Sequence, residues 1–229
     1  SNISAGTLAN ARLPTTISVT NVTASSLISA SFLYGDGSNL TGIEVPLLVG
    51  NSLFVDGING NDGTGTRGDK SQPYLTISSA IAASIAGDAI YVTPGDYPET
   101  SLAIPAGRAL FSQGGYAQTS IGITSSATDI ITTVDDTWIE GFTVHVPTGS
   151  SNAGIRYTGG TGGTMQAYSM AFSGDGASGQ GDGFVKTGTG KVIGSEIRLV
   201  KGGLSSIIRV DQGVMAFESI HVPSASGDI

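Results

Sequence analysis

Residues 52–99 read SLFVDGINGNDGTGTRGDKSQPYLTISSAIAASIAGDAIYVTPGDYPE, and this stretch decides the fold of the chain. Its apolar runs predict a strand at 52–56 and a second strand at 89–93, with a loop rich in Gly, Asn and Asp after the first. A short helix is predicted between them, at about 74–86, from apolar residues at helical spacing and from alanine-rich neighbours. The helical set is Leu75, Ile77, Ile81 and Ile85. The sequence shows no other convincing helix.

The same stretch resembles the N-terminal module of parallel β-helix proteins of the pectate-lyase-like kind. The resemblance lies in VDG, GND, QPYLTISSAIAA and GDAIYVTPGDYPE, which follow one another in residues 55–99. It implies that the helix caps the open end of a right-handed β-helix and that the strand in GDAIYVTPGDY forms the first rung. It implies no particular chemistry, because one scaffold can carry many unrelated functions.

Composition points to an all-β protein. Glycine supplies 35 of the 229 residues, charged residues only 12%, and hydrophobic residues 39%. Apolar residues at short, regular spacing among many glycines are typical of short strands joined by tight turns. The chain has no cysteine, so disulfide bonds do not hold this fold together.

Charge and hydropathy argue against two classes of partner. The formal net charge is −8, which makes nucleic acid an unsuitable ligand. No apolar run approaches the roughly 18 residues that a membrane-spanning helix needs, so no membrane insertion is expected. The chain begins with Ser and shows no signal peptide, and we expect it to be a segment of a longer polypeptide.

An internal repeat follows the N-terminal module, in residues 100–229. The strands GFTVHV, YSMAFS, SEIRLV and ESIHVP carry the equivalent residues Phe142, Met170, Ile197 and Ile220, which are 28, 27 and 23 residues apart. A second series, Ile155, Phe184 and Ile208, repeats at 29 and 24. A period in the twenties matches coils of three short strands, and stacked coils share one core. The sequence therefore predicts a parallel β-helix over residues 51–229.

Residues 1–50 differ in character, with scattered apolar residues among Ser, Thr, Asn and Ala. That apolar content is too thin for a monomeric fold of about fifty residues. Two pieces, GTLANARLP and FLYGDGSNLTGI, resemble short repeats in the shafts of trimeric tail fibres and tail spikes of bacterial viruses. The resemblance implies an extended β segment, intertwined in a homotrimer, that serves as shaft or attachment segment. A flexible linker is the alternative.

Catalytic candidates are few. Asp175 and Asp182 share one Gly-rich loop, where two carboxylates could perform acid and base chemistry on a glycosidic bond. Aspartate is also common in such loops simply because its side chain closes turns. We therefore expect no catalytic residue, with this pair as the candidate if one exists.

The loop after the first strand is rich in oxygen ligands. Asp56, Asn59, Asn61 and Asp62 could hold a hard cation such as Ca²⁺, although their spacing does not match an EF-hand loop. Turn formation is the simpler explanation for these residues, and no cofactor is required by the sequence.

Aromatic side chains are the candidates for contact with sugars, which stack on flat apolar faces. Tyr157, Tyr168 and Trp138 are the predicted glycan-binding residues. Tyr157 is predicted to point outward from the strand GIRYTG, whereas Trp138 could equally pack at a corner of a coil.

These observations favour a structural subunit of a virion tail fibre or tail spike that mediates attachment to a host-surface glycan. Its expected partners are two further copies of itself, other tail or baseplate proteins through residues 1–50, and host polysaccharide. The expected location is extracellular, on the virion. One alternative is a tail-spike depolymerase, a polysaccharide hydrolase or lyase; another is a cellular surface adhesin.

Overall fold

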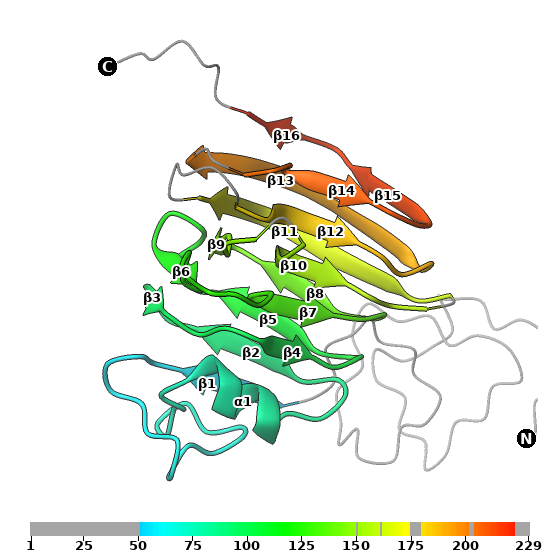
Figure 1. Cartoon of the computed structure of the whole chain (residues 1–229). Coiled ribbons are helices and arrows are strands. Elements are labelled where there is room, and N and C mark those ends of the chain that lie inside the picture. The colour runs from blue at the N-terminus through cyan, green and yellow to red at the C-terminus, as the bar shows by residue number, and fades with distance from the viewer. Residues whose placement is uncertain (1–50, 150, 161, 175–179, 202–203, 223–229) are drawn as a thin grey trace, which may run out of the picture. The chain divides into compact units, whose positions relative to one another are not determined.

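The computed structural model describes residues 51–149, 151–160, 162–174, 180–201 and 204–222. Every strand pair formed by these residues is parallel, and strands distant in sequence stack in register as layers of a β-helix. Figure 1 shows α1 (Ile77–Ala83) at one end of the stack and β16 (Ile220–His221) at the other. The predicted all-β architecture with one short helix at its start is therefore confirmed. The predicted shaft segment, 1–50, lies outside the described residues.

One long, bent sheet contains two lines of strands. The first line comprises β1 (Ser52–Val55), β2 (Ala89–Val92), β5 (Ala109–Ser112) and β8 (Trp138–Glu140). The second comprises β3 (Gly95–Tyr97), β6 (Thr119–Ile121) and β9 (Thr143–His145). Strand β11 (Thr164–Ser173) joins the lines, because its first half pairs with β8 and its second half with β9. Strand β13 (Lys191–Lys201) stacks on β11, and β15 (Val214–Phe217) and β16 stack on β13.

A separate five-stranded sheet closes each coil. It consists of β4 (Leu102–Ile104), β7 (Ile131–Thr133), β10 (Ala153–Tyr157), β12 (Asp182–Lys186) and β14 (Ile208–Val210). The core lies between the sheets, where side chains of successive coils form columns. One column contains Leu53, Ile90, Leu110 and Ile139, and all four are fully buried. Because parallel stacking places like positions on top of one another, each coil buries the apolar residues of its neighbours.

The repeat predicted from the sequence is confirmed by the register of the later strands. Met170 pairs with Ile197, and Ile197 pairs with Ile220, in the predicted register. In the second series Phe184 lies between Ile155 and Ile208, again as predicted. The spacing of apolar residues in the sequence thus corresponds directly to the stacking of coils.

The helix is shorter than the predicted span of 74–86: it ends at Ala83, where Ser84 turns to extended backbone angles, and contacts at its start explain why it begins late. Tyr74 forms a parallel bridge with Val55, so this residue belongs to the stack and not to the helix. Thr76 has extended backbone angles and caps α1 by accepting a hydrogen bond from the Ser79 N–H. The carboxylate of Glu99 accepts from the free N–H groups of the first helical turn, at 2.7 and 2.8 Å. These caps satisfy the donors that every helix start leaves unpaired.

Candidate glycan-binding face

An outward-facing ladder of aromatic rings runs along the long sheet. Its members, all half-buried, are Phe54, Tyr91, Phe111, Trp138 and Tyr168. Consecutive ring centroids are 5.9, 5.5, 5.3 and 5.7 Å apart. These separations lie within the range of favourable aromatic pairs. The ladder therefore forms one continuous apolar stripe across β1, β2, β5, β8 and β11.

The register of the strands explains the positions of the first three rings of the ladder. Phe54 is paired with Tyr91, and Tyr91 is paired with Phe111, so the three rings occupy equivalent positions in successive layers. Side chains of a strand alternate between its two faces. Each aromatic residue follows an inward aliphatic residue and must therefore point outward.

The next layer departs from this column. The residue in register with Phe111 and with Tyr168 is Glu140, which carries no ring. Trp138 lies two residues earlier on β8, on the same face, and its indole bridges the gap between the neighbouring rings. The Trp138 Nε1–H donates a hydrogen bond to the Glu140 carboxylate at 3.1 Å, which fixes the indole in this position.

The ladder ends at Tyr168. The next residue in its column is Ser195, which is too small to continue the stack. A hollow of about 290 Å³ lies there, lined by Tyr168, Ile193, Gly194, Ala216, Phe217 and Glu218. Two aromatic residues, aliphatic walls and one carboxylate together suit a sugar, whose C–H groups need an apolar surface and whose hydroxyl groups need an acceptor.

Two of the three predicted glycan-binding residues, Trp138 and Tyr168, thus lie side by side at the end of the ladder. The other three rings were not predicted as part of a site. Their signal is present in the tetrapeptides SLFV, AIYV and ALFS, which share a pattern of small, aliphatic and aromatic residues. Aligning these tetrapeptides as successive layers places Phe54, Tyr91 and Phe111 in one column.

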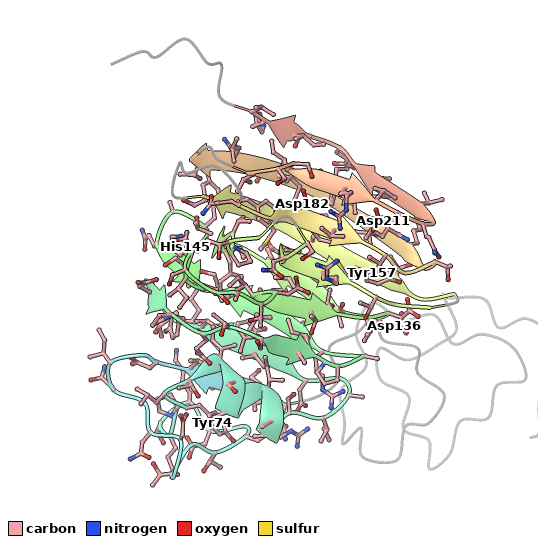
Figure 2. All side chains as sticks on the ribbon, in the orientation of Figure 1. Tyr74, Asp136, His145, Tyr157, Asp182 and Asp211 are labelled. Atoms are coloured by element: carbon pink, nitrogen blue, oxygen red, sulfur yellow. The ribbon has the colours of Figure 1, made fainter. Side chains whose placement is uncertain are left out.

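The prediction that Tyr157 points outward is wrong. Strand alternation places Tyr157, which is labelled in Figure 2, on the same face as Ile155. Its side chain is fully buried. Its hydroxyl group donates a hydrogen bond to the Asp135 carboxylate, and the ammonium of Lys186 lies 5.3 Å from its ring centroid. The polar tip of Tyr157 therefore binds inside the coil, where no sugar ring can stack on it.

Titration of this buried tyrosine gives a prediction at high pH. Burial, and then Asp135, raise the pKa of Tyr157 above its ordinary value of 10.0. Because the folded pKa is the higher one, the contribution of Tyr157 to stability is complete below pH 10.0 and falls as the pH rises toward the folded value. Burial lowers the pKa of Lys186, although Asp135 opposes this effect. Because the folded pKa of Lys186 is the lower one, the stability of the protein rises with pH through this residue only up to the ordinary value of 10.5.

We therefore expect the wild-type protein to lose stability more steeply than Tyr157→Phe above about pH 10.5. Urea unfolding at a series of alkaline pH values measures both slopes. Tyr91→Phe, which removes an outward hydroxyl group, serves as the control and should keep the wild-type slope. Equal slopes for Tyr157→Phe and the wild type would contradict the buried pairing.

The predicted catalytic pair is not brought together among the described residues, because Asp175 lies outside them. Asp182 is buried and forms an ion pair with Arg209, and it accepts a hydrogen bond from the Ser206 hydroxyl group at 2.6 Å. An equivalent ion pair occurs two layers earlier, where Arg156 pairs with Asp129 at 2.5 Å. In both cases the arginine follows its aspartate by 27 residues. Asp182 therefore fastens one coil to the next.

The side-chain oxygen atoms of the predicted cation loop accept hydrogen bonds from backbone N–H groups of this loop and of the segment before the helix. Asp56 accepts from the N–H groups of Ile58 and Asn59 at 2.9 and 3.0 Å, and these bonds hold the pKa of Asp56 below its ordinary value. Asn61 closes a turn at Gly63. Asp62 accepts from the N–H groups of residues 75 and 76 and so fixes the chain before the helix. In the part of the chain that is described, no three His, Asp or Glu side chains are grouped to hold a metal ion.

Two comparisons with known proteins found a match. Residues 58–157 match a family described as "Protein of unknown function (DUF1565)". A solved structure named "Rhamnogalacturonan lyase" is similar over 79% of this chain, with 12% sequence identity and a TM-score of 0.38. The chain covers 64% of the length of that lyase. No curated protein matches the sequence. None of the helices in the described ranges has the length and apolar character required to cross a membrane.

Proposed function

We propose that this chain is a structural subunit of a virion tail fibre or spike and that Tyr168 and its hollow attach it to a host-surface glycan. One observation carries the proposal: the aromatic ladder ends in a hollow with a carboxylate, Glu218, on its wall. Ligand sites combine apolar and aromatic walls with a few polar groups that fix orientation. Such a shallow site gives weak binding by itself, which suits attachment through many copies.

The viral part of the proposal is supported by the sequence of residues 1–50. Their GTLANARLP and FLYGDGSNLTGI segments resemble fibre-shaft repeats, and their thin apolar content favours burial between chains. The β-helix would then be carried as a homotrimer on the virion, with residues 1–50 joining it to other tail or baseplate proteins. Three aligned copies would multiply the glycan sites and raise the avidity. A solution mass of three chains, measured by light scattering, is expected.

The burial of Asp182 and its ion pair with Arg209 favour glycan binding over glycan cleavage. Its carboxylate is buried and neutralised by Arg209, so it cannot act as a free acid or base on a sugar. A glycosidase needs two carboxyl groups that face one bond. The ladder needs no such pair, because aromatic stacking and hydrogen bonding are sufficient for attachment.

Replacing Tyr168 with leucine is expected to weaken glycan binding at least tenfold, which is about 1.4 kcal/mol. Leucine keeps an apolar side chain but removes the flat ring on which a sugar stacks. A glycan array of bacterial surface oligosaccharides would identify the ligand, and calorimetric titration of the intact chain would give its affinity for both proteins.

Tyr91→Leu is the matched control, because it makes the same chemical change on the same outward face, away from the hollow. It should bind the selected oligosaccharide as the wild type does. Equal affinities for Tyr168→Leu and the wild type would show that the hollow is not the attachment site, whatever the control does.

A further inference from the structure

Arg198 differs from the other arginines that the structure describes in having no oxygen partner. The others are Arg67 with Asp88, Arg156 with Asp129, Arg209 with Asp182, and Arg108 with the carbonyl groups of Ser84 and Ala106. Arg198 forms no hydrogen bond or ion pair with any described residue, and its Nε is buried without a partner. A buried donor without an acceptor is costly, so its presence in a folded protein calls for an explanation.

The guanidinium of Arg198 is nevertheless held in place. Its Cζ lies 5.4 Å from the ring centroid of Tyr116, in the connection between β5 and β6. The backbone carbonyl group of Tyr116 accepts a hydrogen bond from the Thr143 hydroxyl group at 2.7 Å, so the backbone at Tyr116 is fastened to β9. A cation over an aromatic face is attracted by the ring and keeps its N–H donors free at the edges. Arg198 is thus a cation placed on an aromatic ring, and no described residue accepts from its donors. Because its Nε is buried, its two terminal amino groups are the donors that can reach a ligand.

A polar hollow of about 430 Å³ lies beside Tyr116. Its wall includes Asp96, Gln118, Ser120, Thr143 and His145. A second hollow of about 330 Å³ shares Asp96 and His145 with the first and extends it toward the connection after β6. The Ser120 and Thr143 hydroxyl groups donate to Asp96 and to the Tyr116 carbonyl group and remain available as acceptors. The Gln118 amide and the His145 imidazole supply donors, so the wall offers both kinds of group to the hydroxyl groups of a saccharide.

The Asp96 carboxylate and the Arg198 guanidinium determine which end of a charged ligand lies at which end of this face. Asp96 and Arg198 lie at the two ends of one column, in which Ser120, Thr143 and the fully buried Ala171 stand between them. Four strand spacings, or roughly 19 Å, separate the backbones of the two residues. The guanidinium itself lies nearer the hollow, because it packs on Tyr116, which lines the hollow together with Asp96. A negative group is attracted at the Arg198 end and repelled at the Asp96 end. The ligand that reaches both ends is a chain of sugars with its negative group at Arg198.

We propose that Arg198 binds the carboxylate of an acidic oligosaccharide whose sugar rings lie in the hollow beside Tyr116. A guanidinium donates two parallel hydrogen bonds to a carboxylate, and the aromatic support keeps it ready to do so. This site is separate from the Tyr168 hollow and lies on the β3, β6 and β9 line of the sheet. It shares a glycan ligand with the proposed function and can be tested independently of it.

Calorimetric titration of the intact chain with a trisaccharide of glucuronic acid, and with its methyl ester, tests the proposal. The ester has the same rings and hydroxyl groups but no charge. We expect the wild type to bind the acid about tenfold more tightly than the ester, the difference expected for one charge-assisted contact. Equal affinities for acid and ester would overturn the proposal, and this comparison requires no variant to fold.

Variants then assign the effect to Arg198. Arg198→Gln should bind acid and ester equally, whereas Lys191→Gln, which removes an exposed charge from the same strand, should keep the tenfold preference. Tyr116→Leu should reduce the preference by loosening the guanidinium. Inorganic phosphate that competes as well as the trisaccharide would overturn the assignment to a sugar acid.

The same titrations distinguish the Arg198 site from the Tyr168 hollow. About tenfold weaker binding of the acidic trisaccharide in Arg198→Gln, with wild-type binding in Tyr168→Leu, supports this inference, even if no host glycan binds at the ladder. Loss in Tyr168→Leu with an unchanged preference in Arg198→Gln overturns it, and leaves the proposed function standing.

Discussion

Replacing Asp88 with alanine is expected to lower the free energy of unfolding by about 3–5 kcal/mol. The Asp88 side chain is fully buried and forms two 2.6 Å hydrogen bonds with Arg67. It also accepts from the backbone N–H groups of Asn51 and Ile85, at 2.9 and 2.8 Å. The alanine variant leaves the Arg67 cation and two N–H groups without this acceptor. Asp88 lies directly before β2, where the segment that contains α1 joins the stack of coils. Urea unfolding followed by circular dichroism measures the loss.

Asp69→Ala is the matched control, because Asp69 is only half-buried and its carboxylate accepts hydrogen bonds within its own turn, from the N–H and hydroxyl groups of Ser71. Its effect should be much smaller than that of Asp88→Ala. Burial acts to raise the pKa of Asp88, but Arg67 and the backbone donors outweigh it, so the pKa lies below its ordinary value of 3.8. The contribution of Asp88 is therefore complete above pH 3.8 and falls as the pH drops through the folded value. Equal effects of the two variants at neutral pH would contradict the structure.

Replacing Phe172 with alanine is expected to cost about 3–5 kcal/mol of stability. The Phe172 side chain is fully buried at the second line of the long sheet, in register with Val144. Its ring faces two glycines of the opposite sheet: an added Cβ would come within 3.2 Å of it at Gly154 and 3.0 Å at Gly183. Because these glycines have no side chain to move into the space, the cavity cannot be filled by repacking. Denaturant unfolding of the variant and the wild type measures this loss.

Phe111→Ala is the control for this truncation, since Phe111 is half-buried on the outward ladder. It loses ring contacts worth about 0.5–1.5 kcal/mol for each pair and leaves no internal cavity. We therefore expect a smaller loss than for Phe172→Ala. If the outward truncation proved the more damaging of the two, the assignment of inner and outer faces would be wrong.

Much of the fold can be predicted from the sequence because stacking is periodic. Met170, Ile197 and Ile220 recur at the coil period, and the structure pairs them in that order. The helix boundary could not be predicted in the same way, because the bridge between Tyr74 and Val55 is a contact between segments. Helical spacing of Leu75 with later residues is a local property and carries no information on that bridge.

The candidate site was predicted only in part, for a related reason. Trp138 and Tyr168 are conspicuous as single aromatic residues, whereas the ladder depends on register across several layers. Tyr157 was misplaced because a tyrosine on a short strand suits either face when its partners are unknown. The Asp135 carboxylate that accepts its hydrogen bond lies 22 residues earlier in the chain, beyond any local pattern.

Trp138 offers the most direct test of the central claim, that a sugar stacks on Tyr168 at the end of the ladder. It is the single tryptophan of the chain, and its ring centroid lies 5.7 Å from that of Tyr168. Titration of the intact chain with the oligosaccharide selected on the array should produce a saturable change in tryptophan emission. The change should persist in Tyr91→Leu and disappear in Tyr168→Leu. Calorimetrically proven binding that leaves the emission of Trp138 unchanged would contradict the account.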